Sequence, residues 1–235
     1  MGYESVAPLS TVQYCLAISG PRSVMGSGRV LAVINLKSRL LDLANMKYIS
    51  MPFRYDDPDP RFRKVETRGP LTIYENTAAL PRAWLVSRAV PVGTPDQAAQ
   101  VLHSPDFDPR TTVVLEEKEI PRTADGGGAV TWKVRETDRL ELTADAKADS
   151  LLVLSDTHYP GWEATVDGVP APVLRANLAF RAVAVPAGTH QVAMRFRPAS
   201  VRYGLIGTSL SIAAVLGLYG WKRFKSRKAG GILPT

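Results

Sequence analysis

The sequence predicts a mainly β protein with some α-helix, in which an antiparallel β-sandwich-like extracytoplasmic domain precedes one carboxyl-terminal transmembrane helix. Three observations support this fold class. An uninterrupted apolar run covers Tyr203 to Trp221, a cluster of basic residues follows it directly, and apolar and polar residues alternate along much of 129–198. A period of two is the signature of half-buried strands, and a long apolar run without charge is the signature of a membrane span.

The run YGLIGTSLSIAAVLGLYGW contains no Asp, Glu, Lys, Arg, His or Pro. As a helix its 19 residues would be about 28 Å long, close to the thickness of a bilayer's hydrocarbon core. Tyr203 lies at one end and Tyr219 and Trp221 at the other, where aromatic rings favour the membrane–water boundary. A buried core helix is the alternative, but such helices rarely run this long without a polar face.

The charge of the chain indicates the orientation of this helix. Of the 29 Lys and Arg residues, five follow Trp221 with no acidic residue among them. The remaining 24 are nearly balanced in charge by 22 Asp and Glu. The positive-inside rule therefore places the basic tail, 222–235, in the cytoplasm and the main domain outside it. The nearly balanced charge of that domain argues against nucleic-acid binding.

The amino-terminal part of the chain bears on how the domain reaches the membrane. Met1 to Gly20 has no basic segment followed by a long apolar one, so we expect no signal peptide there. Cys15 is the only cysteine, and no internal disulfide can form. We expect missing upstream membrane helices, which would make this chain the carboxyl-terminal piece of a larger membrane protein. The small-residue pairs Gly207/Ser211 and Ala213/Gly217 favour packing of the span against other helices.

Residues 1–125 predict an α+β extracytoplasmic region. Leu36 to Ala44 has near-helical apolar spacing, and Thr94-Pro95-Asp96-Gln97 carries the cap, proline and glutamine of a helix start. Strands are predicted at Lys47–Met51, Leu71–Glu75, Ala83–Val90 and Thr111–Glu116. Two turn-like segments, Gly26–Arg29 and Asp56–Pro60, are read as loops rather than as phosphate or cation sites. The Gly-rich Arg122–Gly128 forms a soft domain boundary.

Residues 129–198 predict the antiparallel β-sandwich. Leu151 to Leu154 is a continuous apolar run typical of a central strand, and Asp167-Gly168 is a strong hairpin turn after the alternating Trp162, Ala164 and Val166. Val192, Met194 and Phe196 alternate with polar residues in a last strand that ends at Pro198. The domains are thus 1–125, 129–198, the transmembrane helix 203–221 and the tail 222–235.

Catalytic and metal-binding patterns are weak. Asp156-Thr157-His158 after an apolar strand resembles one corner of a two-metal phosphoesterase site, but the further ligands of such a site are missing. A turn in which Asp156 accepts backbone hydrogen bonds is the preferred interpretation. Glu116 and Glu117 should point to opposite faces of a strand, which argues against a shared acid–base site. We therefore predict no catalytic residue, no metal and no cofactor.

One group of residues is a candidate binding site. An aromatic ring, an amide and guanidinium groups are the means by which proteins hold sugars and phosphates. Trp162, Arg175, Asn177 and Arg181 provide these groups near a predicted hairpin, and Phe180 lies among them. The alternative is that Trp162 and Phe180 fill the core while the arginines are solvated.

Residues 151–198 (LLVLSDTHYPGWEATVDGVPAPVLRANLAFRAVAVPAGTHQVAMRFRP), followed by the span, resemble the carboxyl-terminal end of bacterial YfhO-type membrane proteins. The segments GYESVAP (Gly2–Pro8), LLDLANMKYI (Leu40–Ile49) and ENTAALPRAWLV (Glu75–Val86) resemble the same family in the same order. The most specific part is Tyr159 to Trp162, together with Asp167-Gly168 and the Arg-x-Asn of Arg175 to Asn177.

This resemblance implies a role in the cell envelope. The family consists of large multi-span proteins similar to GT-C-type glycosyltransferases, implicated in glycosylating polymers such as teichoic acids from lipid-linked sugars outside the bacterial cytoplasmic membrane. The catalytic carboxylate of GT-C enzymes lies in an early loop that has no counterpart here, so no catalytic role is carried over. The expected partners are the lipid bilayer, other transmembrane helices and a glycan or envelope polymer. The rival hypothesis is a stand-alone, membrane-anchored binding or scaffold module.

Overall fold

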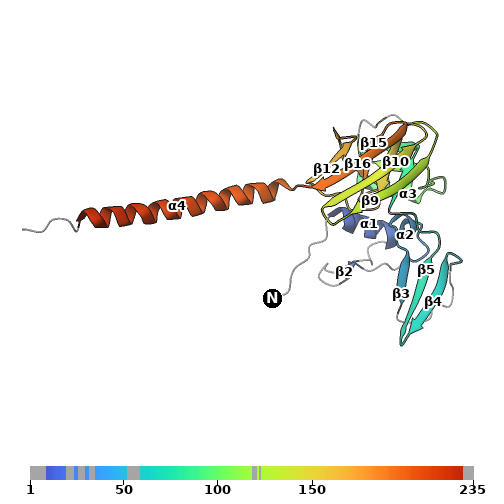
Figure 1. Ribbon diagram of the computed structural model, residues 1–235. Coiled ribbons are helices and arrows are strands. Elements are labelled where there is room, and N and C mark those ends of the chain that lie inside the picture. Colours follow the sequence, from blue (N-terminus) through green and yellow to red (C-terminus); the bar gives the residue numbers. More distant parts are fainter. Residues whose placement is uncertain are drawn as a thin grey trace, which may run out of the picture. The chain divides into compact units, whose positions relative to one another are not determined.

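The computed structural model describes residues 9–19, 24–25, 30–31, 35–51, 59–117, 121 and 123–229 (Figure 1). The Gly-rich segment 26–29 and residues 56–58 of the Asp-Pro turn lie outside this range, as do the side chains from 222 onward. The chain divides into two compact units, Met1–Arg195 and Phe196–Thr235. The elements of the first unit before the large sheets are α1 (Leu9–Ser19), β1 (Val24–Met25), β2 (Val30–Leu31), α2 (Leu40–Leu43), β3 (Tyr48–Met51), β4 (Phe62–Arg68) and β5 (Leu71–Asn76).

A six-stranded sheet has the order β6-β11-β15-β14-β8-β7. Its strands are β6 (Ala83–Val86), β7 (Arg88–Pro91), β8 (Thr112–Leu115), β11 (Ser150–Leu154), β14 (Leu174–Ala176) and β15 (Phe180–Val185). All its pairs are antiparallel except β7 with β8, which is parallel. The sheet joins strands from both sides of the Gly-rich segment 122–128, so the soft domain boundary predicted there does not separate two sheets.

Ser87 alone separates β6 from β7, although these strands lie at opposite edges of the sheet. The sheet must therefore curl until its two edges meet at this residue. The sequence predicts one strand from Ala83 to Val90, and the structure breaks it into two halves. The Ser87 amide donates to Thr111 O at 3.1 Å at the break.

The second large sheet has five strands in the order β13-β12-β16-β10-β9. They are β9 (Gly128–Arg135), β10 (Arg139–Ala146), β12 (Trp162–Val166), β13 (Val169–Ala171) and β16 (Gly188–Phe196). β12 and β13 form the predicted hairpin, and both turn residues have the positive φ that a tight hairpin turn requires, 51° at Asp167 and 82° at Gly168. These sheets confirm the mainly β, antiparallel fold class.

Two apolar cores lie on opposite faces of the six-stranded sheet. Leu152 and Leu154 of β11 belong to a core shared with Leu140 and Met194 of the five-stranded sheet. The neighbouring Leu151 and Val153 belong to a core shared with the helices. Alternate side chains of a strand point to opposite faces, so burial on both sides makes β11 apolar throughout and explains its continuous run. All five of its residues are buried.

Three short helices and a small sheet cover the second core. Tyr14 and Ile18 of α1 and the three leucines of α2 are buried there. α3 (Pro95–His103) begins as the sequence predicts, because the Thr94 hydroxyl accepts from Gln97 N. β3, β5 and β4 form the three-stranded sheet, with β5 in the middle.

The second unit is dominated by α4 (Ala199–Ala229). Ala199–Trp221 is the one helical segment of the described residues that is long and apolar enough to cross a membrane. Its large apolar side chains are exposed, as Leu210 and Leu216 illustrate. The predicted carboxyl-terminal apolar helix is therefore present, and it begins four residues earlier than Tyr203.

Candidate functional site

Asp156, just after β11, lies between two arginines. Its Oδ1 accepts from Nε of Arg82 at 2.8 Å, and its Oδ2 accepts from Nη2 of Arg82 at 3.0 Å. The same Oδ2 forms an ion pair with Nη2 of Arg181, also at 3.0 Å. Arg82 precedes β6 and Arg181 lies on β15, so strands on both sides of β11 converge on this carboxylate. The sequence-based prediction that the Asp156 side chain accepts backbone hydrogen bonds in a turn is therefore wrong. The carboxylate instead forms ion pairs with Arg82 and Arg181.

Each of these arginines also stacks on an indole of the five-stranded sheet. The Arg181 guanidinium carbon lies 3.9 Å from the ring centroid of Trp162, and that of Arg82 lies 5.3 Å from the ring centroid of Trp132. We call these five residues (Arg82, Trp132, Asp156, Trp162 and Arg181) the Asp156 cluster. Because its charges come from one sheet and its aromatic rings from the other, the cluster joins the two layers.

Arg181 is the most buried member of the Asp156 cluster, with 3% of its surface exposed. Burial lowers the pKa of its guanidinium to about 10, an effect that Asp156 opposes, so the group keeps its charge at neutral pH. Its Nη1 atom has no hydrogen-bond partner among the described residues. The buried, stacked guanidinium of Arg181 is fixed in place, so this side chain cannot reach out to contact a large ligand.

Asn177 is fully buried in the turn between β14 and β15. Its side-chain Oδ1 accepts from Val114 N at 2.9 Å, and its backbone N–H donates to Val114 O at 2.8 Å. This pair of hydrogen bonds extends the ladder from the hairpin to β8. Its backbone φ of 47° lies in the left-handed region, which asparagine tolerates better than most residues.

Arg175 faces Arg181 across the β14–β15 ladder. Its guanidinium donates to Leu178 O and to Gln13 Oε1, each at 2.7 Å, and forms an ion pair with Glu116 at 3.2 Å. Burial raises the pKa of Glu116, and Arg175 opposes that shift. Arg175 thus fastens helix α1 and the end of β8 to the hairpin.

The structure brings the four predicted residues to one region but gives them different exposures. Trp162 and Arg175 are half-buried, whereas Asn177 and Arg181 are buried and bonded within the domain. The alternative that the arginines are solvated does not hold for Arg181. Phe180 is a core residue, and its ring centroid lies 4.8 Å from that of Tyr14.

His158 lies close to this region, since its amide donates to Ala179 O. Burial, and then the positive charge of Arg175, lower the pKa of the His158 imidazole. Among the described residues, no three His, Cys, Asp or Glu side chains are grouped as metal ligands would be.

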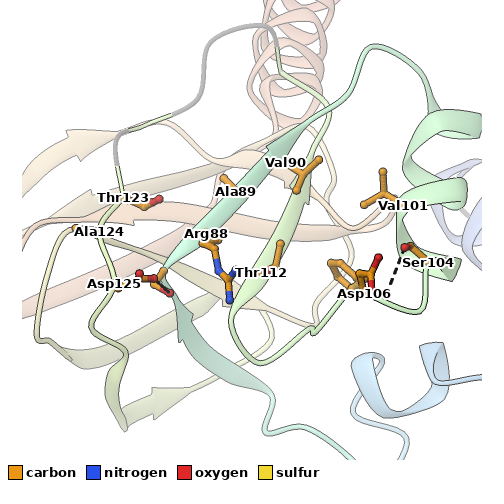
Figure 2. Close-up of a pocket in the computed structure, with 12 residues that line it drawn as sticks. Arg88, Ala89, Val90, Val101, Ser104, Asp106, Thr112, Thr123, Ala124 and Asp125 are labelled. Carbon is orange, nitrogen blue, oxygen red and sulfur yellow. Dashed lines mark hydrogen bonds between the residues drawn. The ribbon is translucent and has the colours of Figure 1, made fainter.

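A hollow of about 620 Å³ opens where β7 and β8 form the edge of the six-stranded sheet (Figure 2). In this view Arg88 lies between Asp125 on one side and Asp106 on the other. Hydroxyl groups from Ser87, Ser104, Thr112 and Thr123 and the apolar Val90, Val101 and Phe107 complete most of the wall. This size is typical of ligand pockets.

Sequence reasoning missed this hollow because it is built from four separate segments. Two of its polar residues, Arg88 and Thr112, lie on strands, and the others lie in connecting segments that carry no motif. The single hint was the cap of α3, because a well-defined helix there fixes where the following loop begins. The parallel pairing of β7 with β8, which brings Arg88 beside Thr112, has no local signal.

The first unit is rich in antiparallel β-strands, and a helix that is long and apolar enough to cross a membrane follows it in the sequence. Residues 122–208 match the family model of the bacterial membrane protein YfhO. The match contains the segment in which the resemblance is most specific and reaches into α4, and it confirms the resemblance over these residues. The three earlier segments that resemble the family lie outside the match. A search of the curated proteins and a search of the solved structures found no match.

Proposed function

We propose that this chain is the carboxyl-terminal extracytoplasmic domain and last membrane helix of a YfhO-like multi-span protein that takes part in glycosylation of cell-envelope polymers. The observation that carries the proposal is the family match over 122–208, which covers most of the sandwich and the start of α4. In this proposal the catalytic part lies in other membrane helices, and the present chain supplies a non-catalytic outer domain.

The charge pattern supports the proposed orientation. Five Lys and Arg residues follow Trp221 directly, and such residues are retained on the cytoplasmic side. The domain before α4 would then face outward, on the side where envelope polymers are assembled. Gly207 and Ser211, one helical turn apart, would allow another helix to approach closely.

We propose further that the region of Trp162, Arg175, Asn177 and Arg181 contributes to holding glycan or polymer. The half-exposed Trp162 and Arg175 would make the contacts, and the buried Asn177 and Arg181 would hold them in position. Glycan binding that is unchanged after Trp162→Ala and Arg175→Ala would refute this role. Because those two side chains are partly exposed, their removal costs the fold less than removal of the buried pair would.

The membership of a larger protein is tested first by the DNA upstream of Met1. The proposal expects several apolar spans there, either in frame or in a neighbouring gene. A gene deletion should lower the sugar content of an envelope polymer, and only a copy that includes this domain should restore it. Full restoration by a copy that ends before Leu9 would refute a role for the domain.

A stand-alone, membrane-anchored binding module is the second candidate. The observation that favours it is the hollow beside β7 and β8, which belongs to the first unit alone. Upstream DNA without apolar spans would favour this second candidate over the first.

A further inference from the structure

The hollow beside β7 and β8 is the first of three that follow one another along the first unit. A second, of about 290 Å³, shares Asp106 and Phe107 with it. A third, of about 340 Å³, shares Leu80 and Arg110 with the second. Because neighbouring hollows share wall residues, they lie next to one another along the loop 104–110. We call this row of three hollows the track. A track suits an extended chain better than a single compact ligand.

The loop 104–110 is held firmly in place. Arg39 donates to Ser104 O at 2.8 Å, and the indole of Trp84 donates to Pro109 O at 2.9 Å. Phe107 is buried in the core, and Asp108 accepts from Arg110 N at 3.0 Å. A loop anchored at this many points is preorganised, so a ligand bound along it would not have to pay for ordering the loop.

The wall chemistry suits a ligand with many hydroxyl groups. Serine and threonine hydroxyls both donate and accept, carboxylates accept from hydroxyl groups, and guanidinium groups donate to their oxygens. The first hollow has all three kinds of group, with apolar surface from Val90 and Val101 between them. Small apolar areas among hydrogen-bonding groups match the alternating C–H and O–H faces of sugar rings.

The charges along the track are balanced. Three arginines and four aspartates line it, and one of the aspartates, Asp42, is ion-paired with Arg61 at 2.8 Å. The charged lining residues are Arg39, Arg88, Arg110, Asp42, Asp106, Asp108 and Asp125. A site for a polyanion would instead carry an excess of positive charge. The balance therefore favours an uncharged ligand.

We propose that this track binds an uncharged polysaccharide chain, laid along the loop 104–110 from the β7–β8 edge toward Arg110. The proposal goes beyond the role in glycosylation proposed above, which assigns no role to these residues, and beyond the stand-alone module, for which no ligand is named. It requires only that the domain be folded and its outer surface accessible.

The test measures binding to the full chain in phosphatidylcholine nanodiscs, because sugar-based detergents would compete for the site. The probes are maltohexaose, cellohexaose, the corresponding disaccharides and an inorganic polyphosphate. The affinity of each probe is measured by isothermal titration calorimetry. We expect at least one hexasaccharide to bind at least tenfold more tightly than its disaccharide, since only the longer chain reaches two hollows. Polyphosphate should bind more weakly than that hexasaccharide.

Two substitutions remove wall groups that neighbouring hollows share. Asp106→Ala and Arg110→Ala should each weaken hexasaccharide binding at least tenfold. Asp106 and Arg110 are exposed, and their side chains make no hydrogen bond or ion pair within the described part of the chain, so the fold should survive. Asp138→Ala and Arg195→Ala are the matched controls, because both residues are exposed and lie outside the three hollows.

The proposal fails if neither hexasaccharide binds, if the disaccharides bind equally well, or if polyphosphate binds most tightly. It also fails if the control substitutions weaken binding as much as the two track substitutions do. None of these results bears on the upstream DNA or on the gene deletion, so the proposed function stands or falls separately.

Discussion

At the scale of single residues, Asp156 balances the charge of two arginines at the contact between the sheets. It is the counter-ion of Arg181, whose side chain is 4% exposed, and it also binds Arg82. Breaking a buried ion pair from one side leaves the other charge without compensation, and this costs more than the pair contributes when intact. The stability of the contact between the sheets therefore depends on this carboxylate.

We predict that Asp156→Ala lowers the free energy of unfolding by about 3 kcal/mol, because Arg181 would remain charged and buried. For a chain of this size this corresponds to a fall of roughly 6–12 °C in the melting temperature. Circular dichroism during heating measures it, with the exposed Asp138→Ala as the control. Equal melting temperatures for the two variants would contradict the assigned role.

His190 and Asp167 form a pH-dependent pair on the surface. His190 Nδ1 and Asp167 Oδ2 are 2.6 Å apart, and Asp167 also accepts from Gln191 N. The hydrogen bond with Asp167 raises the pKa of His190, and the hydrogen bond with His190 lowers the pKa of Asp167. The pair thus fastens the β12–β13 turn to β16 when both groups are charged.

We predict that the pair contributes most to stability between pH 3.8 and 6.5, the ordinary pKa values of the two groups. The raised pKa of His190 means that its contribution is complete below 6.5 and is lost as pH rises through the folded value. The lowered pKa of Asp167 means that its contribution is lost as pH falls below 3.8. Melting temperatures of the wild type and His190→Gln should differ inside this window and converge above it. A difference that is constant with pH would contradict this. The effect should be small because the pair is exposed.

The Asp156 cluster could not be predicted from the sequence. Arg82 and Asp156 are 74 residues apart, and only the pairing of β6 with β11 brings them together. The sequence does identify Trp162 and Arg181 as neighbours, because the aromatic and basic residues lie near one hairpin. It gives no indication that Arg181 is buried, since an arginine on a strand is usually solvated.

At the scale of elements, β11 is the strand that both cores share. Leu152 is fully buried against the five-stranded sheet, while its neighbours are buried against the helices. We predict that Leu152→Ala lowers the free energy of unfolding by about 2–5 kcal/mol, through lost apolar contact and a cavity. Denaturant unfolding measures this, and Val169→Ala, which truncates an exposed strand residue, should change stability by less than about 0.5 kcal/mol. Similar losses for both variants would contradict the full burial of Leu152.

Local patterns predict the strands after Ala129 and the start of α3 well, because alternation and capping are properties of neighbouring residues. They do not predict α1, since LSTVQYCLAIS has no polar face of helical period and reads as an apolar patch. They also join β6 and β7 into one strand. Nothing in the local sequence shows that the two halves pair with different partners, β11 and β8.

At the scale of the whole molecule, the topology proposed for α4 can be measured by thiol labelling. In the gene with Cys15→Ser, we predict that an impermeant maleimide labels Asp138→Cys in intact cells and labels Thr235→Cys only after lysis. The physical reason is the retention of the basic tail on the cytoplasmic side. Labelling of Thr235→Cys in intact cells would reverse the orientation. Cys15→Ser alone, which should remain unlabelled, is the control.

The six-stranded sheet has a consequence for how such a domain is inherited. The family match begins at residue 122, yet β11 and β14 within it are hydrogen-bonded to β6 and β8, which precede that residue. Gene recombination that transferred only 122–208 would deliver strands with unpaired edges, which are prone to aggregation. A transfer that survives selection must carry the chain from at least Arg82, so residues outside the family match are expected to travel with those inside it.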